Sequence, residues 1–372
     1  MRWLARVLFL DPYHGTSHRA LSTALRDLSR HSVTLLPLPP RKWKWRMRGA
    51  ALAYEPLVRA IHPAPELLVA TDMLNLPEFL ALTRDHLPPR LPVITYFHEN
   101  QLTYPSPSAD ERDFHFGLTN IYTALCSDRI VFNSEFHREE FLAAIPGTLK
   151  LMPDFRPADV PQRIRARSEV LGPPVEAAPP AGAAGDGPPR QNLILWNHRW
   201  EDDKDPEAFF RVMRRLDRAG DDFRLMILGE SYRGQPACFE TARRDLAHRI
   251  ERWGYIPSRQ EYLEAVARCR IVVSTARHEF FGLAVREAIA RGCHPLLPRR
   301  VVYPEMMAGQ DAHLYDTEDE LFERLEAVLL RPSAGDTIFP LPTTGTLDCK
   351  EVVARWDGWI DAMAPATDDV LA

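Results

Sequence analysis

The segment "STARHEFFGLAVREAIARG", residues 274–292, has the pattern of a buried strand that leads into a polar loop, a glycine and a helix. Gly292 would end the helix, Glu279 lies in the loop, and Glu287 lies about a turn and a half into the helix. In a doubly wound sheet, ligands bind beyond the carboxyl ends of the strands, where a helix N-terminus offers free N–H groups to phosphate. Gly282 would let a ligand approach the backbone closely. Two carboxylates beside an anion site suit hydrogen bonds to sugar hydroxyls, although glutamates at this spacing also occur as plain surface charges.

Short apolar runs alternate with longer helical patterns through most of the chain. The first half contains "ARVLFL", "HSVTLLPL", "ELLVAT", "LPVITYFH" and "DRIVFNS". The second half contains "NLILWNH", "FRLMILGE", "RIVVST" and "CHPLLP". Runs of this kind are typical of strands buried on both faces, so the rhythm predicts an α/β protein with two parallel sheets and crossover helices.

A change in composition separates the two halves. Residues 165–190 are rich in Pro, Ala and Gly and have no periodicity, which predicts a flexible linker. A chain of 372 residues is long enough for two domains, here residues 1–164 and 191–345. Residues 346–372 have apolar side chains at helical spacing and predict one C-terminal amphipathic helix.

Composition restricts the class of protein. The 46 Lys and Arg against 51 Asp and Glu give a net charge of -5, so no general basic field attracts nucleic acid or anionic membrane. Five scattered cysteines without a C-x-x-C pair argue against a disulfide framework or a zinc ribbon. No apolar stretch has the length of a signal sequence or a membrane span. We therefore expect a cytoplasmic protein that neither enters nor binds a membrane.

The segment "EFFGLAVRE" resembles the E-x(7)-E motif of retaining glycosyltransferases with the GT-B fold. The resemblance implies two Rossmann-like lobes whose parallel sheets face each other across a cleft, with a nucleotide-sugar bound by the second lobe. It also implies that Glu287 bonds the ribose of the donor. Glu279 and the backbone of the next four residues would border the donor hexose: Phe280, Phe281, Gly282 and Leu283.

The segment "WNHRWEDDKDP" supplies Arg199 and Lys204 after an expected strand, and the pair is similar to the Arg/Lys pair that holds the donor diphosphate in the same family. Arg grips two phosphate oxygens with its planar fork, and Lys adds charge where the leaving group becomes more negative. No metal or other cofactor is then required. Alone, the two cations would pass for solvated side chains in a charged loop. Gly229 and Tyr255 lie in further strand-end loops and are weaker candidates for contact with the nucleotide.

The first lobe offers its own strand-end loops. "LDPYHGTSH" contains Gly15, which resembles the glycine of the first-strand loop beside the transferred sugar, although a turn glycine often has only a conformational role. "YFHENQLTYP" contains His98, Glu99 and Asn100. The family resemblance places His98 against the donor sugar as a catalytic group, and a capping or core histidine is the alternative. Asn133, in "VFNSEFHREEF", is a further candidate.

Several segments together narrow the resemblance to the tRNA-queuosine α-mannosyltransferase group. They include "PYHGTSH", "FHENQLTYP", "NSEFHREEF" and "RHEFFGLAVREAIARGCHPLLPRRVVYPE". This resemblance implies retaining transfer of mannose from GDP-mannose to the cyclopentenediol of queuosine in the anticodon of an aspartate tRNA. Glu99, Asn100 and Asn133 would then contact the acceptor, and residues 1–164 would form the tRNA-binding domain. The partners would be a tRNA that contains queuosine and a nucleotide-sugar.

The segment "RKWKWRMR", residues 41–48, interleaves cations with indoles. Cations neutralise phosphates and indoles stack on unpaired bases, so Trp43, Lys44, Trp45 and Arg46 are candidates for contact with an anticodon loop. Two other interpretations remain open. Both tryptophans could pack inward while the cations face water, or the segment could lie on a membrane surface and point to a lipid acceptor.

Three other functions remain compatible with these residues. The first is a GT-B hexosyltransferase that uses another nucleotide-sugar or a lipid or small-molecule acceptor. The second is a noncatalytic tRNA-binding protein on a transferase scaffold, and the presence of both glutamates and both cations argues against it. The third is a GT-B epimerase, which the context of His98 disfavours.

Overall fold

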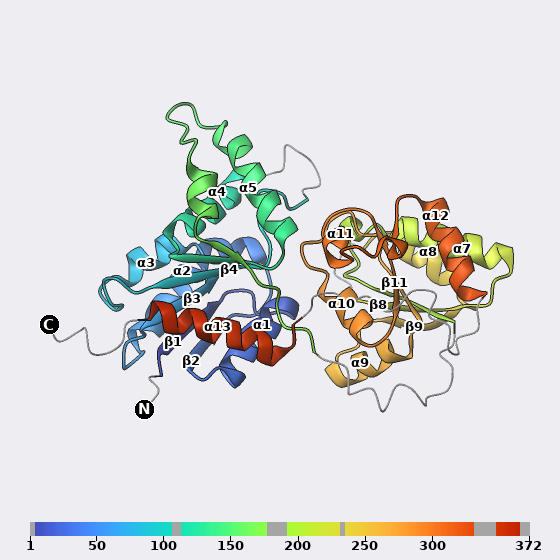
Figure 1. Cartoon of the computed structure of the whole chain (residues 1–372), viewed down its shortest axis with the longest axis horizontal. Helices are drawn as coiled ribbons and strands as arrows, with labels where there is room; N and C mark the ends of the chain where they lie inside the picture. The colour runs from blue at the N-terminus through green and yellow to red at the C-terminus, as the bar shows by residue number, and fades with distance from the viewer. Residues whose placement is uncertain (1–3, 106–112, 177–191, 231–234, 331–346, 365–372) are drawn as a thin grey trace. The chain divides into compact units, whose positions relative to one another are not determined.

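The computed structural model describes residues 4–105, 113–176, 192–230, 235–330 and 347–364 (Figure 1). The chain divides into two compact units. The first comprises Met1–Pro174 and Leu347–Ala372, and the second comprises Val175–Thr346.

The first unit contains a parallel sheet of six strands in the order β2-β1-β3-β4-β5-β6. The strands are β1 (Arg6–Asp11), β2 (Ser32–Pro37), β3 (Leu67–Thr71), β4 (Val93–Phe97), β5 (Arg129–Phe132) and β6 (Ser168–Val170). Every residue of β3 and β4 is buried, as expected for strands covered by helices on both faces. The strand order reverses between β1 and β3, which is where a doubly wound sheet binds ligands.

Helices cover both faces of this sheet. They are α1 (Thr16–Leu28), α2 (Trp43–Arg59), α3 (Leu76–Thr83), α4 (Phe114–Cys126), α5 (Glu135–Leu149), α6 (Val160–Arg165) and α13 (Cys349–Met363). One face of β1 and β3 packs on α1 and α13, and the opposite face packs on α2 and α3.

The C-terminal helix α13 returns to the first unit and lies beside α1 (Figure 1). Its N-terminus has a capping box, in which Asp348 and Glu351 bond each other's backbone N–H groups. Trp356 is fully buried, with its ring 6.0 Å from that of Tyr96. Asp357 accepts a hydrogen bond of 2.5 Å from the Ser29 hydroxyl. The expected amphipathic helix is therefore part of the core of the first unit.

The expected linker at residues 165–190 begins too early. Ser168–Val170 forms the edge strand β6, which pairs with β5, and Val175 is also buried. The sequence of β6 is short and partly polar because an edge strand is covered less than a central one, so it lacks the apolar run that marks the other strands. Residues 177–190 of the expected linker lie outside the described residues.

The second unit repeats the architecture with a parallel sheet in the order β12-β11-β10-β7-β8-β9. Its strands are β7 (Leu193–Asn197), β8 (Arg224–Leu228), β9 (Ile250–Gly254), β10 (Ile271–Val273), β11 (His294–Pro298) and β12 (Leu314–Tyr315). The chain builds β8 and β9 on one side of β7 and β10 to β12 on the other. The reversal of strand order therefore lies between β7 and β10.

The described helices of the second unit are α7 (Pro206–Ala219), α8 (Cys238–Asp245), α9 (Arg259–Arg268), α10 (Leu283–Ala290), α11 (Tyr303–Met306) and α12 (Glu318–Leu329), with 3-10 turns η2 (Asp202–Lys204) and η3 (Asp311–His313). The helices α7, α8 and α12 pack with strands of the sheet around an aromatic core that includes Trp196, Phe209, Phe210 and Phe239.

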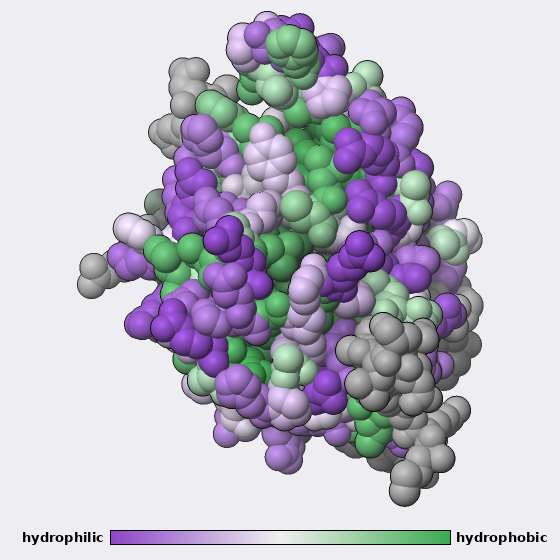
Figure 2. All heavy atoms as spheres, turned by 90° about the vertical axis from the view of Figure 1, so that its left-hand side faces the viewer, coloured by the Kyte–Doolittle hydropathy of each residue, from purple (hydrophilic) through white to green (hydrophobic). Residues whose placement is uncertain are grey.

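The surface is mixed in character. On the face that Figure 2 shows, hydrophilic side chains are interspersed with hydrophobic ones. Among the helices that the structure describes, none combines the length and the apolar character needed to cross a membrane.

Candidate functional site

The carboxyl ends of β7 and β10 bring together the two segments that the sequence singles out in the second unit. β7 ends at Asn197, two residues before Arg199, and Lys204 closes the turn η2. β10 ends at Val273, and its loop leads through Glu279 to α10. Because β7 and β10 are neighbours at the reversal of strand order, both loops leave the same edge of the sheet.

Lys204 is buried, with a side chain surrounded by oxygen atoms. Its Nζ lies 2.6 Å from the carbonyl oxygen of His278, 3.3 Å from Glu279 Oε2 and 3.1 Å from Asp203 Oδ2. Thr275 fixes the turn by donating its hydroxyl to the Lys204 carbonyl at 2.9 Å. The ammonium group is therefore held in one place at the edge of the sheet, where it can stabilise charge on a bound anion.

Glu279 stays ionised in this setting. Burial by itself would raise the pKa of its carboxyl group, but the charge of Lys204 and the backbone N–H of Gly282 outweigh burial and lower the pKa to about 2. That N–H donates to Glu279 Oε1 at 3.1 Å. Gly282 has a positive φ of 76°, and a Cβ there would lie 2.8 Å from the terminal carbon of Met306. The left-handed backbone therefore favours glycine where α10 begins, immediately beside the carboxylate.

Two histidines beside Lys204 remain uncharged. Burial, together with the charge of Lys204, lowers the pKa of His198 and of His278 to about 4. The positive charge beside Glu279 at neutral pH therefore comes from Lys204 and not from the imidazoles.

Glu287 is buried in α10 and forms an ion pair with Arg259, the first residue of α9. Arg259 also lies 3.4 Å from the carboxylate of Glu176. The Tyr262 hydroxyl, also from α9, accepts a hydrogen bond of 3.0 Å from Asn197 at the end of β7. Nothing in the local sequence of α9 marks Arg259 as a functional residue, because its role depends on the packing of α9 against α10.

The other candidates of the second unit differ in accessibility. Arg199 is partly exposed and lies 3.2 Å from Glu201. Phe280 and Phe281 are buried, with the Phe280 ring against His278 and the Phe281 ring under the Arg286 guanidinium. Their backbone is therefore the part that suits contact with a donor sugar, as it is for Leu283 at the start of α10.

Gly229 and Tyr255 follow β8 and β9. A Cβ at Gly229 would lie 1.8 Å from the carbonyl oxygen of His198, so the loops after β7 and β8 can touch only because this residue is glycine. Tyr255 is exposed beyond the end of β9. Contact of either residue with a nucleotide stays a prediction.

The carboxyl edge of the first sheet contains His98, which is buried directly after β4. Its ring stacks on that of His18 with centroids 3.7 Å apart, and its backbone N–H donates to Asp72 Oδ1 at 2.8 Å. Burial and the nearby charge of His18 hold the pKa of His98 well below its usual value. Gly15 caps α1 and passes close to Pro40, whose Cβ would lie 2.8 Å from a Cβ at that position.

The neighbouring candidates shape the loops of this edge. Asn100 accepts backbone N–H groups of Leu102 and Thr103 at 3.0 Å, and Asn133 donates to the His98 carbonyl at 2.8 Å. Ser134 accepts from the His137 N–H at 3.0 Å, as the N-cap of α5.

The two asparagine side chains are thus buried in intramolecular bonds, and their contact with an acceptor stays a prediction. Glu99 is half-buried and bonds Gln101 at 3.0 Å.

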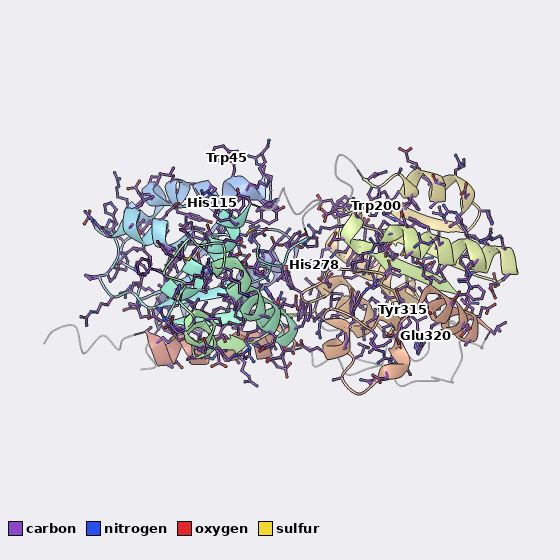
Figure 3. The ribbon with its side chains drawn as sticks, turned by 90° about the horizontal axis from the view of Figure 1, so that it is seen from above. Trp45, His115, Trp200, His278, Tyr315 and Glu320 are labelled. Atoms are coloured by element: carbon purple, nitrogen blue, oxygen red, sulfur yellow. The ribbon has the colours of Figure 1, made fainter. Side chains whose placement is uncertain are left out.

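Most of the basic-aromatic segment forms the first turns of α2. Trp43 packs on Phe116, with ring centroids 5.0 Å apart, whereas Trp45 is 73% exposed and projects from the first unit (Figure 3). The Lys44 ammonium lies 5.6 Å from the Trp43 ring, and Arg46 donates to the carbonyl of Pro39 at 3.0 Å. Trp43 therefore packs inward, whereas Trp45 is exposed to solvent.

No metal site is evident in the described ranges, where no group of three or more His, Cys, Asp or Glu side chains is arranged to hold an ion. The five cysteines, all of which lie in the described ranges, are not joined in disulfides.

Two family models cover most of the chain. Residues 6–175 match the model for the N-terminal part of tRNA-queuosine alpha-mannosyltransferase, and residues 184–333 match the model for glycosyl transferases of group 1. The chain is 35% identical over 328 residues to the tRNA-queuosine alpha-mannosyltransferase of Drosophila melanogaster. That alignment covers 86% of this chain and 85% of the fly protein.

Solved structures share the fold at low identity. The HepE protein of Anabaena, solved in a complex with UDP, is 12% identical to this chain and has a TM-score of 0.64. The match covers 96% of this chain and 100% of the HepE chain. Sucrose-phosphate synthase from Thermosynechococcus elongatus is 14% identical with a TM-score of 0.65 and coverage of 97% and 96%. The expected GT-B class of fold is confirmed, and the chain belongs to the tRNA-queuosine alpha-mannosyltransferase family.

Proposed function

We propose that the chain transfers mannose from GDP-mannose, with retention of configuration, to the cyclopentenediol of queuosine in the anticodon of an aspartate tRNA. The observation that carries the proposal is the 35% identity with the fly tRNA-queuosine alpha-mannosyltransferase along 86% of the chain. The second unit supports it, because Lys204, Glu279 and Glu287 lie at the edge of the sheet where a nucleotide-sugar is expected.

In the proposed reaction, each residue of the second unit has a separate task. Lys204 and Arg199 stabilise the donor diphosphate as it takes up charge, and Glu287 bonds the ribose hydroxyls. The bond from the anomeric carbon to the diphosphate oxygen breaks while the bond to the acceptor oxygen forms on the same face. The acceptor's hydroxyl proton passes to the leaving diphosphate oxygen, so no covalent bond to the protein forms.

The proposal includes no metal ion, because Lys204 and Arg199 supply the positive charge that a metal would otherwise provide at the diphosphate. We expect the transfer rate to be unchanged by EDTA, and restoration of a lost rate by Mg²⁺ or Mn²⁺ would contradict this part of the proposal. We also propose the cytoplasm as the location, since mature tRNA is found there and the five described cysteines form no disulfide.

The test incubates the protein with labelled GDP-mannose, UDP-glucose or UDP-galactose and with tRNA that contains or lacks queuosine. We expect label only on the queuosine-containing tRNA and only from GDP-mannose. Label from a UDP-sugar would identify another donor, and label in a lipid extract would identify another acceptor. If no tRNA is labelled and no donor is hydrolysed while the protein still binds the tRNA, the chain is a noncatalytic tRNA-binding protein.

A further inference from the structure

The carboxyl edge of the first sheet contains a buried cluster of three residues that lies outside the donor-binding residues of the second unit. Asp11 ends β1, His18 lies in the first turn of α1, and His98 follows β4. The His18 and His98 rings are stacked, with centroids 3.7 Å apart and planes inclined by 22°. On its other side His18 Nδ1 lies 3.4 Å from Asp11 Oδ1. The three side chains thus form a row of carboxylate, imidazole and imidazole.

The last ring of this row has unused hydrogen-bonding groups. His98 is buried, and within the part of the chain that the structure describes neither of its ring nitrogens has a hydrogen-bond partner. A buried polar atom without a partner is unfavourable, so native proteins rarely keep one without a functional reason. An uncharged imidazole offers one donor and one acceptor, which are the two roles that a hydroxyl group can complement. A ligand rich in hydroxyls is therefore the chemical class that the ring suits.

The pKa values of the two histidines in the row shift in opposite directions. Burial would lower the pKa of His18, but the Asp11 carboxylate 3.4 Å away raises it. Burial, followed by the charge of His18, lowers the pKa of His98. Asp11 is itself held in place, because its Oδ2 accepts from His14 Nδ1 at 2.8 Å and from the Ser22 hydroxyl at 3.1 Å.

Contacts other than His18 restrain His98 less directly. The ring meets that of Tyr96 edge-on at 4.5 Å, and the backbone is bonded to Asp72 and to Asn133. The two hydrogen bonds hold the backbone of His98 in place, and the stack on His18 is the contact that covers a face of its ring. The orientation of the free ring nitrogens thus depends on His18.

We propose that His18, anchored by Asp11, is a positioning residue that holds the His98 imidazole ready to bond a hydroxyl group of the donor sugar or of the acceptor diol. The inference rests on the proposed function and deepens it, because both substrates of that reaction carry such hydroxyls. His18 acts through His98 and touches neither substrate. Loss of the stack should therefore affect the chemical step more than the affinity for the nucleotide.

The test compares variants of the row with a matched control in full-length protein. His18→Ala removes the stack, His18→Phe keeps a ring that can stack, and Asp11→Asn removes the anchoring charge. His31→Ala is the control, since His31 is buried in the same unit but bonds the backbone N–H of Ala5 at the amino edge of the sheet. For each variant, kcat per GDP-binding site, KM for GDP-mannose and KM for tRNA are measured.

We expect His18→Ala and Asp11→Asn to lower kcat by about tenfold or more at unchanged GDP affinity, because a small misplacement of a reacting group has an effect of this order. His18→Phe should recover most of the loss, and His31→Ala should keep the wild-type kcat. A rise in KM for GDP-mannose would assign the hydroxyl to the donor, and a rise in KM for tRNA would assign it to the acceptor. The inference is wrong if His18→Ala keeps the wild-type kcat or if His18→Phe recovers nothing.

Ring mobility provides a readout that does not depend on activity. In histidine-labelled protein, the imidazole ¹⁵N signals of His98 should be sharp in the wild type and in His31→Ala and broadened in His18→Ala. Equal line widths in all three would overturn the inference. If the wild type transfers no sugar to any tRNA, the proposed function fails, and this measurement still decides whether His18 positions His98.

Discussion

The ammonium nitrogen of Lys204 lies 3.3 Å from Glu279 Oε2, although the two residues are 75 positions apart in the chain. They meet because Lys204 follows β7 and Glu279 follows β10, which are adjacent parallel strands. Glu279 provides a counter-charge for the buried Lys204 side chain, whose ammonium group can also contact a bound diphosphate. Loss of the Lys204 side chain should therefore affect both the stability of the protein and the rate of sugar transfer.

Substitution of Lys204 by Ala is expected to lower kcat for sugar transfer by about a hundredfold, since loss of one preorganised donor has an effect of that size. Affinity for GDP, measured by calorimetry, should fall less, because charge on the diphosphate grows during the reaction. The exposed Lys150, at the C-terminus of α5, provides a control. A Lys204→Ala protein that is folded and as fast as the Lys150→Ala protein would contradict the assignment.

Glu287→Ala is expected to weaken GDP binding by about 1.5–3 kcal/mol, the usual value of a hydrogen bond to a charged group. Arg259→Ala should weaken it less, because Arg259 orients the carboxylate without being expected to bond the ribose. Titration calorimetry with GDP measures both effects. The control is Glu264→Ala on the exposed side of α9, and equal affinities for the Glu287 and Glu264 variants would exclude Glu287 from the ribose site.

The two sheets could be predicted from the sequence because strands that are buried on both faces appear as short apolar runs. β7, with the sequence LILWN, is an example. The same logic fails for β6, whose sequence SEV is short and partly polar at the edge of the sheet. The start of the expected linker therefore lies several residues too early, although the units divide after Pro174, inside the expected range.

The residues of the donor side could be predicted only in part. Lys204 and Glu279 lie in the loops that follow two strands, so the ends of parallel strands indicate that they are near each other. Arg259 could not be found in this way, because its contact with Glu287 is set by how α9 packs on α10. Likewise, the stack of His18 on His98 joins α1 to the end of β4 and leaves no local signal in either segment.

The directions in which Trp43 and Trp45 point depend on whether the segment forms a strand or a helix. Two residues apart in a strand they would share a face, but in α2 they point in nearly opposite directions. We expect Trp45→Ala to weaken tRNA binding by about 1–3 kcal/mol without loss of stability, since one exposed indole can stack on one base. Trp43→Ala should mainly lower the melting temperature, because its ring packs on Phe116.

Filter binding with queuosine-containing tRNA and thermal unfolding separate these two effects. Leu57→Ala serves as the control, since Leu57 is an exposed apolar residue near the other end of the same helix. Unchanged tRNA affinity in Trp45→Ala would remove this tryptophan from the acceptor surface.

Lys44 and Arg46 are expected to bind phosphates, because they flank the exposed Trp45 at the start of α2. Removal of one phosphate-binding cation should reduce the slope of log affinity against log salt by about 0.7–0.9. We therefore expect the double variant Lys44→Ala, Arg46→Ala to reduce the slope by about 1.5. A slope equal to that of the wild type, over the same range of salt, would mean that these cations face only water.

Gly229 is expected to be irreplaceable for a steric reason, because a Cβ at this position would lie 1.8 Å from the His198 carbonyl oxygen. Gly229→Ala must therefore move the loop after β7 or the loop after β8, and we expect a loss of roughly 2 kcal/mol or more in the free energy of unfolding. GDP binding should weaken too, since the loop after β7 leads to Lys204.

Gly358 in α13 is the matched control, as a Cβ there meets nothing within 4 Å and the residue is inside a helix. Gly358→Ala should raise stability by about 0.5–1 kcal/mol. Denaturant unfolding measures both effects, and a Gly229→Ala midpoint equal to or above that of the wild type would contradict the steric argument.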